Sequence, residues 1–317
     1  MPRALPLLLL ALAAAWAAPV RVVVFGDFNG AYGTVGYGPA VQGVVRRITQ
    51  EWKPALVLMP GDLVAGQSLR LGAGRLEAMW RAFDREIAGP LRRAGIPYAP
   101  AMGNHDASSA RNRSGGFVFA LDRTAARSYW GRNVPDLEFV DRSQFPFAYS
   151  FTLGEVFVAV VDASSAALQD REWLARSLAS SAAQQASTRV VMGHLPLYGV
   201  SAGRSTPGNV LWDGEAIRGL LERHRVGLYV SGHHAAYYPA KRGNLTLLHA
   251  GGIGGRDYLG HPGTARSTVT LLELWPDQGR LAFTAYDAVT GEVVPITSLP
   301  RRIDGLNGPI TRFDLAR

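Results

Sequence analysis

Short apolar runs rich in β-branched residues alternate along this chain with segments whose apolar residues recur every three or four positions. Residues 20–25 form the first such run and predict a buried strand. Residues 39–52 carry valines and an isoleucine at helical spacing, with a proline suited to the first turn. Residues 55–59 then resume strand character, so the beginning of the pattern predicts a β–α–β unit. The repetition of this alternation indicates an α/β fold.

The remaining pattern predicts the further elements of a single domain, residues 18–317, with one interruption. Amphipathic spacing predicts helices in residues 69–93, 168–186 and 213–225. Apolar runs predict further strands at residues 97–102, 148–153, 156–162, 189–192, 226–230, 245–249, 269–275 and 281–286. Residues 107–146 show scattered aromatics and charges but no sustained period, and we interpret them as an insertion over one face of the sheet.

The first 17 residues are typical of a secretory signal peptide. Arg3 precedes an apolar block from Ala4 to Ala15, and small residues at positions 15 and 17 match the pattern that signal peptidase cleaves. This block is shorter than the roughly 20 residues that span a bilayer, although an uncleaved N-terminal anchor remains the alternative. We therefore expect a secreted or periplasmic protein whose mature chain has no transmembrane span.

Composition narrows the chemistry that the chain can perform. There is no cysteine, which excludes disulfides, thiolate metal sites and cysteine nucleophiles, so metal ligands would be His, Asp, Glu or Asn. The formal net charge is +8, and only Lys53 and Lys241 among the 33 basic residues are lysines. The arginines are scattered in ones and twos along the chain rather than clustered with aromatics, so we expect no specific nucleic-acid binding.

Five apolar runs end in the same way, with a glycine followed by a carboxylate, an amide or an imidazole. These endings are Gly26-Asp27, Gly61-Asp62, Gly103-Asn104-His105-Asp106, Gly193-His194 and Gly232-His233-His234. Ligands of open α/β sheets bind beyond the carboxyl ends of the strands, where such residues would meet. A single Gly-Asp pair is more often a turn, but five such endings are hard to assign to chance. Carboxylates, an amide oxygen and imidazoles together suit one or two divalent metal ions.

The order of these endings resembles the calcineurin-like metallophosphoesterases, including the purple acid phosphatase branch, over about residues 20–250. The resemblance implies a four-layer α/β sandwich with two mixed β-sheets flanked by helices. It also implies an exported hydrolase that cleaves phosphate mono- or diesters of small molecules by attack of a metal-activated water. The ions would be Mn, Zn, Fe or Mg, one or two per chain.

The resemblance also implies a role for each matching residue. Asp27 would bind the first metal and Asp62 would bridge both. The second metal would be completed by Asn104, His194 and His233. His105 would act as the general acid toward the leaving oxygen. Asp106 would orient His105 and raise its pKa, although a carboxylate at this position is equally suited to capping a helix.

The chain departs from the family pattern at the first metal. Asn29 stands where a His usually follows the first Asp, and Ala235 stands where the last motif usually has its second His. Ala65 replaces the Tyr of the purple branch, which argues against an iron phenolate chromophore. Substitute ligands for this metal would come from Asn29, His234, His249 or His261. Two alternatives therefore stay open: a mononuclear hydrolase, and a non-catalytic binding protein of the same fold.

Two arginines of the insertion, Arg111 and Arg113, are candidates for clamping a substrate phosphate, because a guanidinium matches phosphate geometry. Solvated loop arginines are the simpler interpretation in a chain that is rich in arginine.

Overall fold

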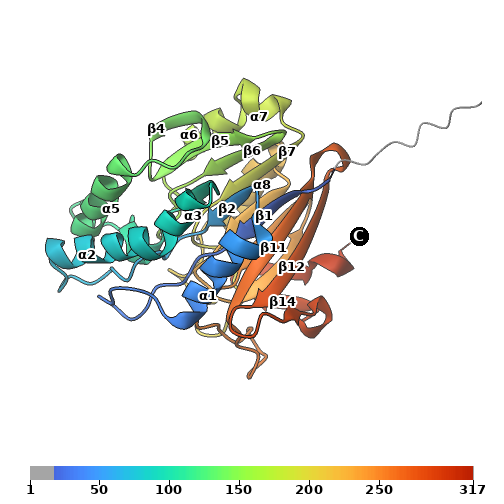
Figure 1. Cartoon of the computed structure of the whole chain (residues 1–317). Coiled ribbons are helices and arrows are strands. Elements are labelled where there is room, and N and C mark those ends of the chain that lie inside the picture. Colours follow the sequence, from blue (N-terminus) through green and yellow to red (C-terminus); the bar gives the residue numbers. More distant parts are fainter. Residues whose placement is uncertain (1–17, 317) are drawn as a thin grey trace, which may run out of the picture.

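Two mixed β-sheets lie face to face in the computed structural model, which describes residues 18–316, and helices cover the outer face of each sheet (Figure 1). The six-stranded sheet has the order β13-β12-β11-β1-β2-β3, and the nine-stranded sheet has the order β14-β15-β9-β10-β8-β7-β6-β5-β4. The predicted four-layer α/β sandwich is therefore confirmed. The predicted signal peptide, residues 1–17, lies outside the described residues.

The elements of the two sheets and their helices have the following bounds. The six-stranded sheet contains β1 (Val20–Val24), β2 (Leu56–Met59), β3 (Tyr98–Pro100), β11 (Thr268–Trp275), β12 (Arg280–Asp287) and β13 (Val293–Val294). The nine-stranded sheet contains β4 (Glu138–Gln144), β5 (Ala148–Leu153), β6 (Val156–Val160), β7 (Thr188–Met192), β8 (Leu228–Ser231), β9 (Tyr237–Arg242), β10 (Leu245–Ala250), β14 (Arg302–Gly305) and β15 (Gly308–Arg312). The helices are α1 (Pro39–Arg47), α2 (Ala73–Phe83), α3 (Gly89–Arg93), α4 (Asn104–Ala107), α5 (Ala120–Arg132), α6 (Arg171–Leu178), α7 (Ser181–Gln185) and α8 (Gly214–Arg223).

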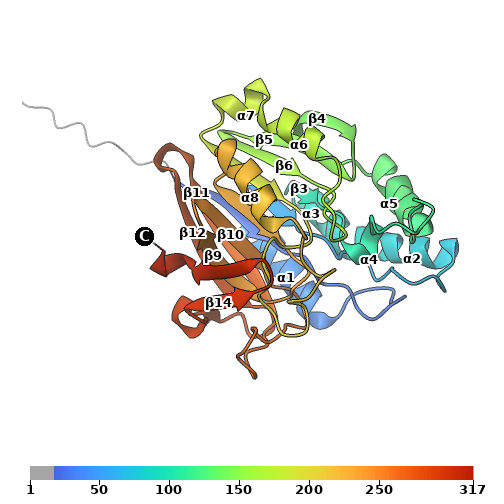
Figure 2. The ribbon, with the colours of Figure 1, turned by 180° about the vertical axis from the view of Figure 1, so that it is seen from behind.

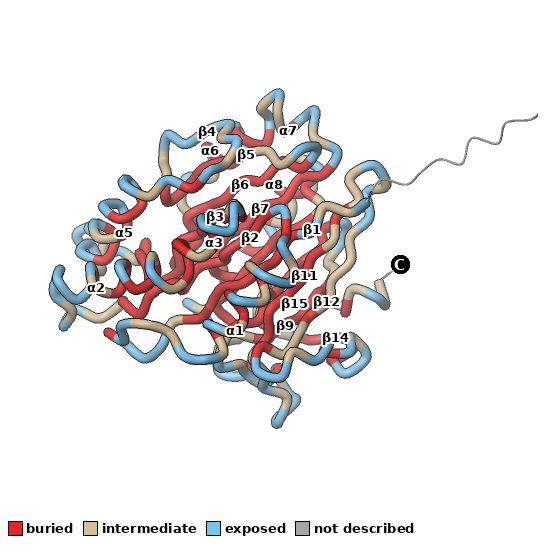
Figure 3. Tube along the Cα trace, viewed as in Figure 1, coloured by how far each residue is buried: buried red, intermediate tan, exposed pale blue. Residues whose placement is uncertain are grey.

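Strand β1 is buried on both faces, and its alternating side chains belong to two different cores. Val22 and Val24 join the core shared with the nine-stranded sheet, whereas Val23 packs with Val41 and Val44 of α1. Figure 2 shows α6, α7 and α8 over the nine-stranded sheet, where α6 contacts β6 and α8 contacts β10. Strands β2, β6, β7, β8 and β10 are buried along their whole length, whereas edge strands such as β4 are partly exposed and the outward faces of the helices are exposed (Figure 3). Because these buried strands have apolar side chains on both faces, they appear in the sequence as continuous apolar runs.

Parallel strands in both sheets direct their carboxyl ends toward the candidate ligands. In the six-stranded sheet β1, β2 and β3 are parallel, and in the nine-stranded sheet β6, β7, β8 and β10 are parallel. Each glycine motif found in the sequence follows one of these strands directly. The loops after β1, β2, β3, β7 and β8 therefore share one edge of the sandwich, as the rule for open α/β sheets requires.

The helices deviate from the predicted spans at identifiable residues. The segment predicted as one helix over residues 69–93 divides into α2, a wide helical turn at Asp84–Ala88, and α3. The segment 168–186 divides into α6 and α7 because Ser180 accepts a hydrogen bond from the backbone of Ala183 and begins a second helix.

Residues 107–146, which show no sustained period, nevertheless contain helix α5 and the edge strand β4. The period of α5 is hidden because the charged residues Asp122 and Arg123 face inward. Arg123 donates to Asp162 at 2.9 Å and to the carbonyl of Ala107 at 2.7 Å, so the helix is tied to the loop after β3. Strand β9 and the C-terminal strands β13, β14 and β15 were not predicted.

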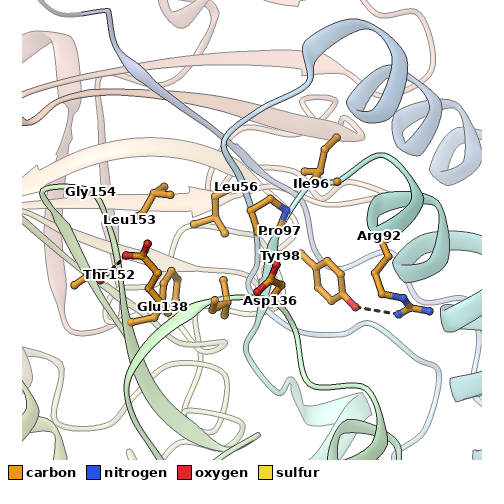
Figure 4. A pocket seen from close by; sticks show the side chains of 13 residues that line it. Leu56, Arg92, Ile96, Pro97, Tyr98, Asp136, Glu138, Thr152, Leu153 and Gly154 are labelled. Carbon is orange, nitrogen blue, oxygen red and sulfur yellow. Dashed lines mark hydrogen bonds between the residues drawn. The ribbon is translucent and has the colours of Figure 1, made fainter.

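A cavity of about 410 Å³ lies at the opposite, amino-terminal ends of β2 and β3 (Figure 4). Leu56, Pro97 and Tyr98 line it, and Arg92 donates a hydrogen bond to the hydroxyl of Tyr98 at 3.1 Å. The cavity is thus separated by the length of the strands from the glycine motifs. No helix within residues 18–316 has the length and apolar character needed to cross a membrane.

Candidate metal centre

The loops that follow the strands are held together by backbone contacts between the two sheets. The backbone N–H of His233 donates to both carboxylate oxygens of Asp27 at 2.9 Å, and the N–H of Asp27 donates to the carbonyl of Gly61 at 2.9 Å. Asp27, Asp62 and His233 all adopt left-handed backbone conformations, with φ of 49°, 54° and 65°. Such conformations are costly for residues other than glycine and are concentrated at functional sites, where the surrounding structure enforces them.

The hydrogen bonds of His194 fix which of its nitrogens carries the proton. Its Nδ1 lies 2.7 Å from the carbonyl oxygen of Pro60, which can only accept, so Nδ1 is the protonated nitrogen. Its Nε2 lies 2.8 Å from Asn104 Oδ1 and 3.3 Å from Asp62 Oδ1. Asn104 is oriented in turn by Gln67, whose Oε1 accepts from Asn104 Nδ2 at 2.7 Å.

His233 is oriented in the same way from the other side of the cluster. Its Nε2 lies 3.0 Å from Oδ1 of Asn209, whose own Nδ2 donates to Thr206, so Nε2 is the donor. The unprotonated Nδ1 is therefore turned toward His194 Nε2, at 3.3 Å. One ligand atom from each of Asp62, His194 and His233 lies within 4.8 Å of the others.

This arrangement brings together four atoms that offer lone pairs: Asp62 Oδ1, Asn104 Oδ1, His194 Nε2 and His233 Nδ1. All four residues are buried, and the positive charge among them comes from the proton that the raised pKa of His194, about 9, keeps on its ring and from Arg204, whose Nη1 lies 3.0 Å from His233 Nδ1. A divalent ion would take the place of such a proton, because a nitrogen ligand must be unprotonated to bind a metal. Two imidazole nitrogens, a carboxylate and an amide oxygen suit a divalent ion of borderline hardness. The donor set therefore fits a metal.

The pKa shifts of the buried groups show strong electrostatic coupling between carboxylates and imidazoles in the cluster. Burial alone would lower the pKa of His194, but the carboxylates of Asp62 and Asp27 raise it to about 9. Burial alone would raise the pKa of Asp62, but the imidazoles of His194 and His105 hold it well below its ordinary value. Asp62 is thus an anion that the surrounding groups stabilise.

Asp27 lies beside the cluster rather than inside it. Its carboxylate is occupied by the backbone N–H of His233, and burial raises its pKa to about 7, with His194 opposing the rise and Asp62 adding to it. A cation near Asp27 would favour its charged form. The predicted first-metal ligand is therefore placed next to Asp62, but without an imidazole partner.

His105 lies at the mouth of the cluster, where its backbone N–H donates to Asp62 Oδ1 at 2.9 Å and its Nε2 lies 3.9 Å from Asp62 Oδ2. The ring of Tyr32 stacks on the imidazole with centroids 5.0 Å apart. The Nδ1 atom of His105 is buried and has no hydrogen-bond partner among residues 18–316.

The position of Asp106 differs from the predicted one. Its Oδ1 accepts from the backbone N–H groups of Leu63 and Val64 at 2.8 Å, and its Oδ2 accepts from Gly103 at 2.7 Å. Asp106 therefore joins the loops after β2 and β3, and its carboxylate oxygens bond to backbone N–H groups rather than to the His105 ring. Burial and the carboxylate of Asp62 raise the pKa of Asp106 to about 7.

The residues considered as substitute ligands lie elsewhere. His234 uses both ring nitrogens in structural bonds, accepting from Val200 at 3.1 Å and facing the carbonyl of Asn209 at 3.0 Å. His249 is buried with its ring centroid 6.3 Å from that of His234. His261 is exposed in a loop, and the side-chain amide of Asn29 faces the carbonyl of Gly30.

A cavity of about 860 Å³ opens over the cluster, and Asn104, His105 and His233 line it. Its wall carries four serines, Ser108, Ser109, Ser164 and Ser165. Three arginines line it: Arg111, Arg204 and Arg256. Of the two arginines singled out in the sequence, Arg111 therefore reaches the cavity and Arg113 is exposed outside its lining. The cavity is cationic and polar, as an anionic substrate requires.

The sequence interpretation missed four residues that shape this site. Gln67 and Asn209 orient two ligands, and Arg204 and Arg256 bring positive charge. Arg256 follows a glycine-rich run after a predicted strand, which was a usable signal, whereas nothing in the pattern around Gln67, Arg204 or Asn209 marks them.

Comparison with known proteins agrees with this geometry. The model of the calcineurin-like phosphoesterase family matches residues 20–237. No curated protein matches the chain.

Solved structures share the fold at low identity. The purple acid phosphatase PPD1 from yellow lupin (Lupinus luteus) seeds has a TM-score of 0.64 and 19% identity, over 88% of this chain and 53% of that one. This chain thus spans about half the length of the lupin enzyme. A dimetal phosphatase from Danio rerio has a TM-score of 0.54 and 13% identity, over 87% of this chain and 99% of that one. GAP50, the anchor in the inner membrane complex of Plasmodium, has a TM-score of 0.50 and 13% identity, over 88% of each chain.

The structural likeness establishes the fold, and the family match covers more than half of the chain, including every motif that supplies the metal centre. This chain therefore belongs to the calcineurin-like phosphoesterases, a family of metal-dependent phosphoric ester hydrolases.

Proposed function

We propose that this protein hydrolyses phosphate mono- or diesters of small molecules, with water as the nucleophile and His105 as the general acid. One observation carries the proposal: candidate ligand atoms of Asp62, Asn104, His194 and His233 converge in a buried cluster under a cationic cavity that also contains His105. A cluster of this kind binds a cation, and the cavity above it suits an anion.

The side chains divide the work of the reaction. Asp62, Asn104, His194 and His233 would hold a divalent ion, which would supply positive charge to the phosphoryl oxygens and would make the attacking water more acidic. The arginines of the cavity bind and orient the anionic ester. His105 donates a proton from Nε2 to the leaving oxygen, and the stacked ring of Tyr32 holds the imidazole in place. Asp106 keeps the loops of the site in register through its three backbone bonds.

The test of this proposal is the variant His105→Asn, assayed with Mn²⁺, Zn²⁺ or Mg²⁺ on phosphate mono- and diesters. We expect kcat to fall roughly 10²- to 10⁴-fold while the bound metal per chain stays unchanged, because the lost group transfers a proton and is not a ligand. The loss should be larger for an alkyl ester than for a nitrophenyl ester, since a poor leaving group depends more on the acid.

The matched control is His224→Asn, at the half-buried end of α8, which should retain full activity. If the unaltered protein shows no turnover with any of these ions, the non-catalytic alternative is correct. If His105→Asn reduces both esters equally, His105 is not the acid.

We also propose that the protein is exported. The support is the charge and apolar pattern of residues 1–17, which is typical of a cleaved secretory signal. The N-terminal sequence of the protein recovered from an expressing cell tests this: a mature chain that begins near residue 18 is expected, and a chain that retains Arg3 would contradict cleavage.

A further inference from the structure

Within the part of the chain that the structure describes, the two positions expected to supply a further ligand beside Asp27, namely 29 and 235, carry no imidazole. Position 235 lies directly beside Asp27, because a Cβ placed on Gly252 would be 2.5 Å from the Cβ of Asp27 and 3.5 Å from that of Ala235. Alanine offers no ligand there. The side chain of Asn29 is partly exposed and its amide faces the neighbouring carbonyl of Gly30. Asp27 and Asp62 are then the two carboxylates of this corner.

Two guanidinium groups border the same corner. Arg204 Nη1 lies 3.0 Å from His233 Nδ1 and 2.5 Å from the carbonyl oxygen of His233. The backbone N–H of Arg256 donates to the carbonyl oxygen of Ala235 at 2.9 Å. Arg256 therefore lies next to position 235, where the family usually has a second histidine. Both side chains line the cavity together with His233. Arg204 is half-buried, whereas Arg256 is more exposed.

Contacts with His233 place Arg204 near Asp27, because His233 accepts from Arg204 through its carbonyl oxygen and donates its N–H to the Asp27 carboxylate. Arg204 and Arg256 line the same cavity. Burial and the cation of Arg204 lower the pKa of Arg256, whereas the carboxylate of Asp27 raises it. The same cation is among the influences that lower the pKa of Asp27. Both arginines are therefore near the carboxylate of Asp27.

We propose that Arg204 and Arg256 replace the second metal ion of this site, so that the substrate phosphoryl group is held between one divalent ion and two guanidiniums. One divalent ion and two arginines carry the same total charge as two divalent ions. A guanidinium stays charged at all working pH values and presents a fork of donors that matches phosphate oxygens. The proposal rests on the proposed function in one respect, namely that the ligand of the cavity is a phosphate ester.

The experiment combines two measurements on the full mature chain, neither of which depends on turnover. Bound Mn²⁺ per chain is measured by equilibrium dialysis, and binding of inorganic phosphate to the Mn²⁺-loaded protein is measured by calorimetry. The variants are Arg204→Gln, Arg204→Lys and Arg256→Gln, with Arg113→Gln as the control because this exposed arginine lies outside the cavity lining.

We expect one Mn²⁺ per chain in the unaltered protein and in every variant. Phosphate affinity should fall roughly tenfold or more in Arg204→Gln, by less in the more exposed Arg256→Gln, and by an intermediate factor in Arg204→Lys, which keeps the charge but not the fork. Arg113→Gln should bind phosphate like the unaltered protein.

Two tightly bound Mn²⁺ ions in the unaltered protein, or unchanged phosphate affinity in Arg204→Gln, would contradict the proposal that arginines replace the second metal ion. An equal loss in Arg113→Gln would also overturn it, because the effect would then come from net charge alone. The proposed function can fail while this proposal holds. If the protein binds one Mn²⁺ and binds phosphate through its arginines but hydrolyses no ester, Arg204 and Arg256 still replace the second metal ion, but in a binding site rather than in an enzyme.

Discussion

His249 lies buried near the end of β10, and neither of its ring nitrogens has a hydrogen-bond partner among residues 18–316. Burial, with a smaller contribution from His234, lowers the pKa of His249 well below its ordinary value. The folded protein therefore keeps this imidazole neutral at a pH where the unfolded chain protonates it. Its contribution to stability is complete above the unfolded pKa of about 6.5 and is lost as the pH falls below that value.

The variant His249→Phe should remove this part of the acid sensitivity. Between pH 8 and pH 5, the free energy of unfolding of the unaltered protein should fall by about 2 kcal/mol more than that of the variant. Urea unfolding at the two pH values measures the difference, and His224→Phe is the control for loss of an imidazole. Equal pH dependence in His249→Phe and the unaltered protein would mean that His249 titrates normally in the fold.

Single residues differ in how far the sequence reveals them. Asp27, Asp62 and His194 were identified because each directly follows a strand and a glycine, and strand direction alone then brings them to one edge. The contact of Asp106 with backbone amides could not be predicted, since it depends on how two loops pass each other. Arg204 lies in a long loop without periodicity, so only the folded chain places it beside His233.

The short helix α4 depends on close contact between the loops after β2 and β3. A Cβ on Gly103 would lie 2.2 Å from both the backbone nitrogen and the Oδ1 of Asp62, so any side chain there must displace a metal-facing carboxylate. The variant Gly103→Ala should therefore weaken Mn²⁺ binding about 10- to 100-fold, although Gly103 donates no atom to the ion. Titration of Mn²⁺ into the metal-free protein measures this loss.

The matched control is Gly74→Ala in α2, where a Cβ would meet nothing within 4 Å. This variant should bind Mn²⁺ normally and should stabilise the helix slightly, because alanine is the better helix former. If Gly103→Ala binds Mn²⁺ as tightly as Gly74→Ala does, the loop contact does not position Asp62.

Elements were predicted well where an apolar period was present. Strands β1, β2, β7 and β8 were located because they are buried on both faces and contain mostly aliphatic residues. Helix α5 was missed because a buried ion pair between Arg123 and Asp162 takes the place of an apolar stripe. Strand β15 was missed because only two of its five residues, Ile310 and Arg312, are buried.

At the scale of the whole molecule, the metal centre joins the two sheets. Asp27 and Asp62 follow strands of the six-stranded sheet, whereas His194 and His233 follow strands of the nine-stranded sheet. An ion held by Asp62, His194 and His233 would therefore stabilise the packing of one sheet on the other, and its removal should affect the global unfolding temperature.

Chelation of the metal with EDTA should lower the Tm by roughly 4 °C relative to protein with Mn²⁺ at about 100 times its Kd. Differential scanning calorimetry measures this shift, and His194→Ala provides the comparison because Mn²⁺ should not raise its Tm. An equal response of His194→Ala to Mn²⁺ would place the stabilising ion elsewhere.

The most direct test is anomalous diffraction from crystals grown with Mn²⁺ or Zn²⁺. The donor cluster predicts one strong peak at about 2.0–2.2 Å from His194 Nε2 and His233 Nδ1, in contact with Asp62 and Asn104. Absence of a peak between these four side chains, with the ion bound elsewhere or not at all, would contradict the metal centre and the hydrolytic function built on it.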